Sequence, residues 1–254
     1  MKILALDTSS KNASVAIVED NTVLIELNNN DEKTHSQKLM PMIDEAFAKA
    51  NLSLDDVDLI ACGLGPGSFT GVRIGIATAK AFSDCKQIPC VGICSLESLA
   101  YNLNEEGYIC TLINANHDNV YAGFFHIVTK NRNLQTLESD FTFLDLKDDN
   151  GNLCGNSLLN FLENNVHVLL PDNSPIYFVG DAVDLYNNFL HNLPFIQNEK
   201  AILASEHCHT LTSISTAKVG YTKYQNGDYG NSNVLTPIYL RKSQAELALN
   251  EVAK

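Results

Sequence analysis

Two loops carry the residues whose types and spacing could bind phosphate. One, residues 63–75, contains five glycines and joins a strand-like segment to an apolar helix. Glycine-rich turns at a helix N-terminus present backbone N–H groups to anions. The other, residues 7–12 (Asp-Thr-Ser-Ser-Lys-Asn), follows the first strand-like segment and supplies one carboxyl group and three hydroxyl groups. Phosphate binding is therefore the first chemistry to consider.

The glycine-rich loop lacks both of the best-known phosphate signatures. A P-loop ends in Gly-Lys-Ser/Thr, and this chain has no lysine between Lys49 and Lys80. A dinucleotide fingerprint beginning at Gly63 needs glycine at position 68, which is a serine. Two interpretations stay open: a plain strand-to-helix turn capped by Ser68 or Thr70, and a phosphate or nucleotide loop, active or vestigial. The second interpretation uses Asp7, Thr8, Ser9, Ser10, Gly65, Gly67 and Ser68.

The helix expected at 70–84 is apolar on most sides, which predicts burial on most sides. Gly71 and Gly75 leave room for a second backbone, and each costs the helix about 1 kcal/mol relative to alanine. The helix is either buried within this chain alone, or packed on its own sheet with one face and on a partner with the other. A helix expected at 34–50 shows a similar apolar excess. On the partner interpretation, Gly75→Leu blocks pairing while the monomer stays folded.

Composition is typical of a well-packed soluble protein. Hydrophobic residues make up 45% of the chain, and no run of 18 apolar residues occurs, so we expect no transmembrane helix. The seven scattered cysteines indicate reduced thiols and a cytoplasmic location. Without a Cys-x-x-Cys pair we expect no metal site. The net charge of −13 argues against a basic nucleic-acid-binding face.

The order of expected elements repeats along the chain. A βββαβαβα pattern runs to about residue 104, and a similar order then begins again. Duplicated units of this kind are the plan of the RNase H-like, actin-like ATPase and sugar-kinase (ASKHA) fold, an α/β fold with two lobes. We therefore expect an N-terminal lobe at 1–104 and a C-terminal lobe at 105–254. The strands are expected at 2–6, 14–18, 22–27, 57–62, 89–93, 109–113, 119–127, 134–144 and 176–179, and further helices at 95–103, 157–164, 181–192 and 210–226.

Four motifs resemble the bacterial TsaB (YeaZ) family. They are Ile-Leu-Ala-Leu-Asp-Thr-Ser at 3–9, Thr-His-Ser-Gln at 34–37, Gly-Pro-Gly-Ser-Phe-Thr-Gly-Val-Arg-Ile-Gly at 65–75, and Pro-Ile-Tyr-Leu-Arg-Lys-Ser-Gln-Ala-Glu at 237–246. The resemblance spans nearly the whole chain, although residues 130–205 contribute little to it. One departure is the second hairpin, where Asn-Ala-Asn at 114–116 stands in place of the family's usual Asp-Ala-Arg.

This resemblance implies a non-catalytic scaffold or activator subunit in the synthesis of N6-threonylcarbamoyladenosine at position 37 of tRNAs that read codons starting with A. It implies that the chain pairs with the related transferase TsaD, that the small ATPase TsaE joins them, and that tRNA is contacted only through the complex. A homodimer is implied when TsaD is absent. The chain alone is expected to bind no cofactor, and ATP or ADP is expected only within the complex.

The resemblance implies that TsaB and TsaD pair through two helices, which match residues 34–50 and 70–84 of this chain. These are the two helices with an excess of apolar residues. A close approach of two helices at this face agrees with the spacing of the two helical glycines. We assign the partner interface to His35, Leu39, Met40, Met42, Ile43, Phe47, Gly71, Ile74, Gly75, Thr78 and Phe82.

Enzymes of the same fold are the alternative class. The TsaD branch binds a metal through two histidines four residues apart on a helix, whereas His35 is followed at that spacing by Leu39. An ATP-dependent small-molecule kinase or ATPase needs a competent phosphate hairpin and a catalytic aspartate, for which Asp7, Asp181 and Asp184 are candidates. A peptidase has no supporting motif of Ser, His and Asp.

Overall fold

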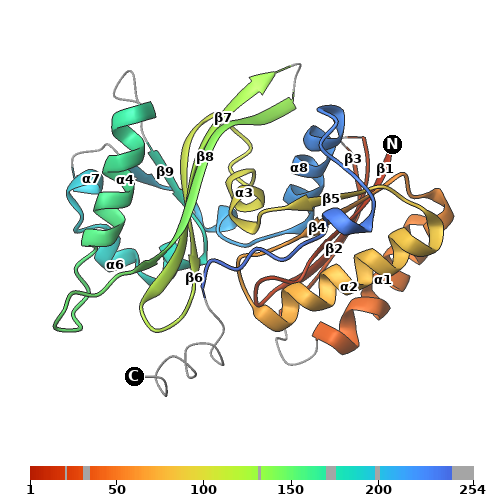
Figure 1. Ribbon diagram of the computed structural model, residues 1–254, viewed down its shortest axis with the longest axis horizontal. Coiled ribbons are helices and arrows are strands. Elements are labelled where there is room, and N and C mark those ends of the chain that lie inside the picture. Colours follow the sequence, from red (N-terminus) through yellow and green to blue (C-terminus); the bar gives the residue numbers. More distant parts are fainter. Residues whose placement is uncertain (21, 31–34, 131–132, 170–175, 198–200, 242–254) are drawn as a thin grey trace.

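The computed structural model of the protein describes residues 1–20, 22–30, 35–130, 133–169, 176–197 and 201–241. Figure 1 shows two lobes side by side, each built around a β-sheet, with helices on the outer faces and between the sheets. Among the described helices, none is long and apolar enough to cross a membrane.

The first sheet has the strand order β3-β2-β1-β4-β5. Its first three strands are antiparallel neighbours, and β1, β4 and β5 pair in parallel. Every residue of β4 is buried, as is all of β1 after its first residue, because helices cover both faces of the sheet. The strands are β1 (Lys2–Asp7), β2 (Ala13–Glu19), β3 (Thr22–Asn29), β4 (Leu59–Gly63) and β5 (Cys90–Ile93).

The second sheet repeats this topology strand for strand. Its order, β10-β9-β6-β7-β8, has the same antiparallel and parallel pairings as the first sheet. This confirms the predicted duplication and the actin-like class. The sequence did not predict β10, because a strand of three residues is too short to show the alternation of apolar and polar residues that marks a strand. The strands are β6 (Gly107–Asn114), β7 (Asn119–Lys130), β8 (Asn133–Asp145), β9 (Ile176–Val179) and β10 (Ala201–Leu203).

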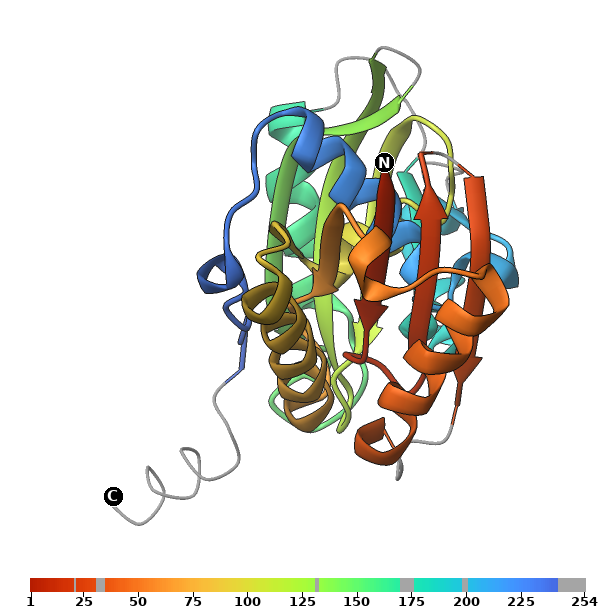
Figure 2. The ribbon, with the colours of Figure 1, turned by 90° about the vertical axis from the view of Figure 1, so that its right-hand side faces the viewer.

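The helices make three layers around the two sheets. Helices α1 (His35–Ala50) and α2 (Phe69–Lys86) lie side by side on the outer face of the first sheet (Figure 2). Between the sheets lie α3 (Ser95–Ala100) and α8 (Ser213–Gln225). The segment expected as one helix at 181–192 is divided in two. The remaining helices are α4 (Asn156–Leu169), α5 (Asp181–Leu185), α6 (Asn187–Leu190) and α7 (Pro194–Gln197), with short 3-10 turns η2 (Leu54–Asp56), η3 (Glu206–Cys208) and η4 (Ser232–Val234).

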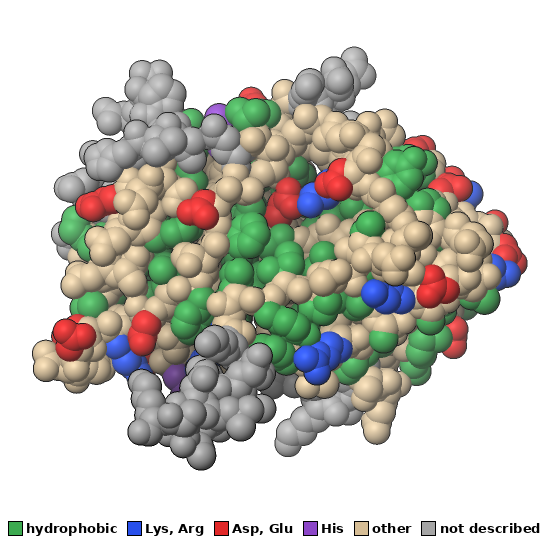
Figure 3. Space-filling view, viewed as in Figure 1, with side chains coloured by type: hydrophobic (Ala, Val, Ile, Leu, Met, Phe, Trp, Pro, Cys, Tyr) green, Lys and Arg blue, Asp and Glu red, His purple; other side chains and the backbone are tan. Residues whose placement is uncertain are grey.

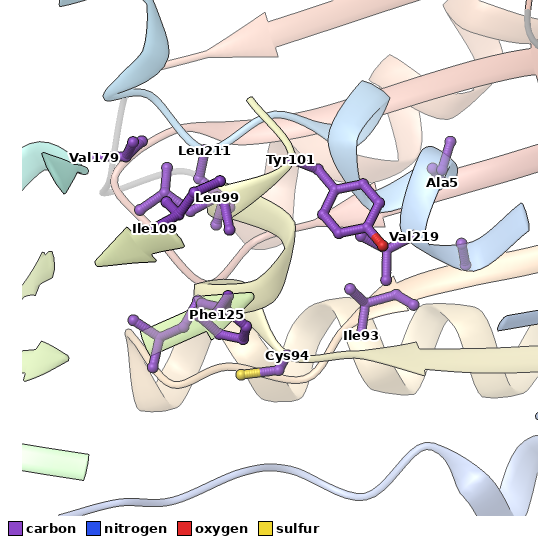
Figure 4. Close-up of a cluster of buried hydrophobic side chains, with 14 of the residues drawn as sticks. Ala5, Ile93, Cys94, Leu99, Tyr101, Ile109, Phe125, Val179, Leu211 and Val219 are labelled. Carbon is purple, nitrogen blue, oxygen red and sulfur yellow. The ribbon is translucent and has the colours of Figure 1, made fainter. Parts of the chain in front are cut away.

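A single hydrophobic cluster joins the two lobes. It combines Ala5 and Ile93 of the first sheet, Ile109 and Phe125 of the second, and side chains from α3 and α8. Figure 4 shows Leu99 and Tyr101, at the end of α3, among these side chains. The lobes are therefore held by a shared apolar core.

The chain returns to the first lobe after it has built the second. Helix α8 packs on β1, β2, β4 and β5. At its start, the amide of Ser213 donates to Oγ of Ser14 in β2 (2.9 Å), and the hydroxyl of Ser213 donates to the carbonyl oxygen of Ser14 (2.7 Å). Residues beyond α8 also contact the first lobe, where Gly230 pairs with Cys90. A division at residue 104 therefore leaves part of the first lobe in the expected second segment.

We expect Gly220→Val to destabilise the protein by separating α8 from the first sheet. A Cβ atom at Gly220 would lie 2.8 Å from the Cβ of Ala61 and 3.2 Å from Cγ1 of Val91, so the larger side chain overpacks the layer. Overpacking of this kind costs about 1–3 kcal/mol. Urea denaturation measures the loss, and Gln225→Val, on an exposed position of the same helix, is the control. Equal stability of the two variants would contradict the contact.

Candidate functional site

The loop between β1 and β2 is closed by its own hydrogen bonds. Asp7 is 1% exposed, and its Oδ1 atom accepts hydrogen bonds from the amide (2.8 Å) and the hydroxyl (2.7 Å) of Ser9. That hydroxyl also lies 2.8 Å from Oγ of Ser95. The second carboxylate oxygen, Oδ2, has no hydrogen-bond partner among the described residues and faces Gly63. Burial raises the pKa of Asp7 to about 6, against the opposing effect of the two bonds from Ser9.

The glycine-rich loop lies directly on this hairpin. The amide of Ser68 donates to the carbonyl oxygen of Ser9 at 2.7 Å, and the hydroxyl of Thr8 donates to the carbonyl oxygen of Gly71 at 2.7 Å. A Cβ atom at Gly67 would lie 2.1 Å from the same Ser9 oxygen. Thr8 and Ser9 are therefore packed against the glycine-rich loop and the first turn of α2, and the amide of Ser68 and the hydroxyl of Thr8 are used in this contact.

The two helical glycines face the same hairpin. A Cβ atom at Gly71 would lie 1.9 Å from the carbonyl oxygen of Thr8, and one at Gly75 would lie 2.5 Å from its Oγ1 atom. Gly71 thus permits the close approach of backbone and Gly75 that of a side chain, and both belong to Thr8 of the same chain. The glycine spacing therefore gives no support for assigning Gly71 and Gly75 to a partner interface, and Gly75→Leu is expected to disturb the monomer itself.

The structure shows which of Ser68 and Thr70 caps the N-terminus of α2. The hydroxyl of Ser68 accepts a hydrogen bond from the amide of Gly71 at 3.2 Å, so Ser68 is the N-cap of α2 and Thr70 lies inside the helix. The loop at 63–75 is thus a strand-to-helix turn capped by Ser68, and its glycines allow close packing. A vestigial phosphate loop is compatible with this geometry.

The predicted interface residues separate by burial. Three side chains of α1 belong to the hydrophobic core beneath the helix and are not available to a partner, because they pack on the first sheet. Met40 is 43% exposed, and four other side chains are partly exposed. The side chain of His35 lies outside the described part of the structure. The buried three are Leu39, Met42 and Ile43, and the partly exposed four are Phe47, Ile74, Thr78 and Phe82.

A cluster at the start of α2 was missed by the sequence interpretation. The ring of Tyr239 stacks on Phe69 with 4.6 Å between centroids, and its hydroxyl accepts a hydrogen bond from Nε of Arg73 at 2.8 Å. Two residues later, Arg241 donates to the carbonyl oxygen of Ala115 at 3.3 Å in the second lobe. The Tyr-Leu-Arg motif therefore ties the two lobes together, along the hydrophobic region between them that Figure 3 shows.

A cleft of about 190 Å³ opens beside the hairpin, between the lobes. Its polar lining includes Ser10 and Lys11 from the first lobe and Asp181, Asp184 and His209 from the second part of the chain. Asp181 accepts a hydrogen bond from the amide of Asn114 (2.8 Å), and Oδ1 of Asp184 lies 3.5 Å from Nε2 of His209. In the described part of the chain, no three His, Cys, Asp or Glu side chains are grouped to hold a metal ion. The kinase candidates Asp181 and Asp184 do share this cleft.

Comparison with known proteins gives relatives in sequence and in structure. The family model described as "TsaD: tRNA N6-adenosine threonylcarbamoyltransferase" matches residues 23–249. The "tRNA threonylcarbamoyladenosine biosynthesis protein TsaB" of Bacillus subtilis is 28% identical over 247 residues, which cover 97% of this chain and 96% of that protein. The protein of the same name from Haemophilus influenzae is 39% identical over 126 residues, 48% of this chain and 52% of that protein.

The solved structure of YeaZ from Pseudomonas aeruginosa superposes with a TM-score of 0.71 at 23% identity, over 94% of this chain and 99% of that chain. A ROK hexokinase from Thermus thermophilus shares the fold with a TM-score of 0.53 at 12% identity, over 89% of this chain and 100% of that chain. Fold and hairpin thus define a protein of the duplicated actin-like class. The chain belongs to the TsaD family matched by the model and, within it, to the TsaB (YeaZ) branch.

We expect Gly71→Ala to lower the free energy of unfolding by about 2 kcal/mol. Helix propensity alone predicts the opposite sign, a gain of about 1 kcal/mol. The added Cβ atom would meet backbone at Thr8, which cannot rotate away. Gly75→Ala is expected to cost less, because it meets the Thr8 side chain. Chemical denaturation of both variants tests the contact, and a stabilised Gly71→Ala protein would rule it out.

We expect the stability of the protein to carry a pH-dependent contribution from Asp7. Its pKa is about 6 in the folded state and 3.8 as the ordinary value, so the folded state holds the proton more tightly. The contribution is fully present below the ordinary value and is lost as the pH rises through about 6. The difference amounts to about 3 kcal/mol.

The measurement is the free energy of unfolding of the wild type and of Asp7→Asn from about pH 4 to about pH 7. Asparagine keeps an acceptor for Ser9 but does not titrate, so the wild type should lose stability relative to the variant as the pH rises. Parallel curves would show that Asp7 is not buried as a carboxyl group.

Proposed function

We propose that this chain is a non-catalytic scaffold or activator subunit that binds TsaD, with TsaE, for N6-threonylcarbamoylation of adenosine 37 in tRNAs that read codons starting with A. The names of the sequence relatives support the pathway, and the family match supports a partner of the same fold. The proposed location is the cytoplasm, and a homodimer is proposed for the isolated chain.

The observation that carries the non-catalytic role is the packing of α2 into the hairpin. The carbonyl oxygens of Thr8 and Ser9 face the glycine-rich loop and the first turn of α2. The amide of Ser68 donates its hydrogen bond to the carbonyl oxygen of Ser9. A phosphate needs several N–H donors converging on an open space. Here the space holds the glycines, which supports a vestigial nucleotide loop and a chain that binds no cofactor alone. ATP or ADP would then be held only within the complex.

The outer surface of α1 and α2 supports a docking role for the first lobe. Helix α2 exposes small side chains, Ala77 and Ala81, next to the partly exposed Ile74 and Thr78. Small residues let another helix approach closely, and Met40 on α1 adds an adaptable apolar contact. A partner that binds the competent form of TsaD raises the population of that form by mass action.

The acidity of the chain supports an indirect contact with tRNA. Its net charge of −13 repels the phosphate backbone, which normally supplies most of the affinity for nucleic acid. The tRNA contacts are therefore assigned to the partners in the complex.

An ATP-dependent small-molecule kinase or ATPase is the second candidate. The observation in its favour is the cleft between the lobes, where Lys11, Asp181 and Asp184 line one space. Reconstituted tRNA modification with the partner proteins, ATP, threonine and bicarbonate separates the two functions. The scaffold requires that product formation depends on this chain and that the chain alone turns over no ATP. Hydrolysis of ATP by the isolated chain would establish the second candidate instead.

We expect Ala77→Arg to weaken pairing with TsaD at least about tenfold, by blocking close helix approach. The position is exposed, so the monomer should keep its stability. Isothermal titration calorimetry with TsaD gives the affinity, and sedimentation velocity gives the homodimer. Asn188→Arg, on the exposed surface of α6, is the control. Wild-type affinity of the Ala77→Arg protein would remove α2 from the interface.

A further inference from the structure

A second cavity, of about 430 Å³, lies at the opposite ends of β2 and β3 from the hairpin cleft. It is bordered by the ends of these strands, by α8 and by the start of β8, and it is open to solvent on one side. The cavity is on the side of the first sheet covered by α8, so the outer surface of α1 and α2 is not part of it. Its volume falls within the range of about 300–1,000 Å³ typical of small-molecule sites.

Most of the lining is apolar or aromatic. Val18 and Val23 are direct partners across β2 and β3, so both side chains project from the same face of the sheet. Tyr101 borders the cavity from the buried core, and its hydroxyl donates to the carbonyl oxygen of Leu134 at 3.3 Å. Ile214 and Tyr221 complete this apolar wall from α8. An occupant gains by burying an apolar body here.

The charged lining residues are one carboxylate, Asp20, and one ammonium group, Lys218. The Oδ1 atom of Asp20 pairs with the N-terminal ammonium of Met1 at 2.8 Å. Nζ of Lys218 donates to the neutral Oδ1 atom of Asn104 at 2.9 Å. Across the described residues, no carboxylate is placed to form an ion pair with Lys218. Lys218 therefore lines the cavity without a direct ion-pair partner among the described residues.

Burial also affects the protonation of this ammonium group. Desolvation lowers the pKa of Lys218, because burial removes water from the charged form of the side chain. In a partly desolvated site the attraction between opposite charges is stronger than in water. An anionic group bound to Lys218 would compensate the charged ammonium group for the hydration that it loses on burial.

We propose that this cavity is a binding site for a small amphipathic carboxylate, with the apolar body against Tyr101 and Tyr221 and the carboxylate on Nζ of Lys218. The site is independent of the proposed role in tRNA modification, because it lies on a different face from α1 and α2. A neutral ligand of the same shape would leave the ammonium without a counter-charge, and a cationic ligand would be repelled by it.

The test uses the full chain and three shape-matched probes: 4-phenylbutyrate, 4-phenylbutan-1-ol and 4-phenylbutylamine. Isothermal titration calorimetry should give a Kd for the carboxylate at or below about 1 mM, about tenfold weaker binding of the alcohol, and no binding of the amine. Absence of carboxylate binding, or equal binding of acid and alcohol, would overturn the proposal.

Variants locate the site. Lys218→Met should abolish the preference for the acid over the alcohol, and Lys218→Gln repeats the test if the methionine variant does not fold. Val23→Trp, at a residue 41% exposed, should block the cavity and remove binding of all three probes. Lys49→Met, on the exposed surface of α1, is the matched control and should bind as the wild type does. Unchanged binding in Lys218→Met or Val23→Trp would place the ligand elsewhere and refute the site.

Discussion

The close contact between α2 and the hairpin after β1 is the constraint on which the rest of the first lobe depends. The Thr8 carbonyl oxygen occupies the place that a side chain at Gly71 would need, and the Ser9 carbonyl oxygen does the same at Gly67. Only glycine allows this approach, and the cost in helix stability is repaid by hydrogen bonds between the two loops. The contact also decides which side of α2 is turned toward solvent.

The same contact gives the two loops at 7–12 and 63–75, whose sequences suggest phosphate binding, a role in packing. Thr8 and Ser9 of the hairpin pack against α2 and the loop before it, while Ser10 and Lys11 line the cleft between the lobes. Asp7 is consequently a buried carboxyl group with a raised pKa, held by Ser9. A group in this position stabilises local structure through its accepted hydrogen bonds. The proposed scaffold role follows from this use of the hairpin for packing, combined with the family to which the chain belongs.

The two lobes are joined by more than their connecting segment. A shared apolar core, built on α3 and α8, fills the space between the sheets (Figure 4). The segment after α8 then crosses from Tyr239, on the first lobe, to Arg241, on the second. Burial of a core common to both sheets couples the stability of each lobe to the other, and it shapes the two cavities at either end of β2 and β3.

The order of most elements and the duplication could be predicted from the sequence, and the cap of α2 could be narrowed to Ser68 or Thr70, because hydrophobic periodicity and capping residues act over a few neighbouring positions. The two glycines indicated a close approach, but only the tertiary structure decided that Gly71 meets the backbone of Thr8, and Gly75 its side chain, within the same chain. Likewise, no local pattern assigns α8 to the first sheet, forms the three-residue β10, or brings Tyr239 to Arg73. These contacts join residues far apart in sequence, and their partners are selected by how the whole chain packs.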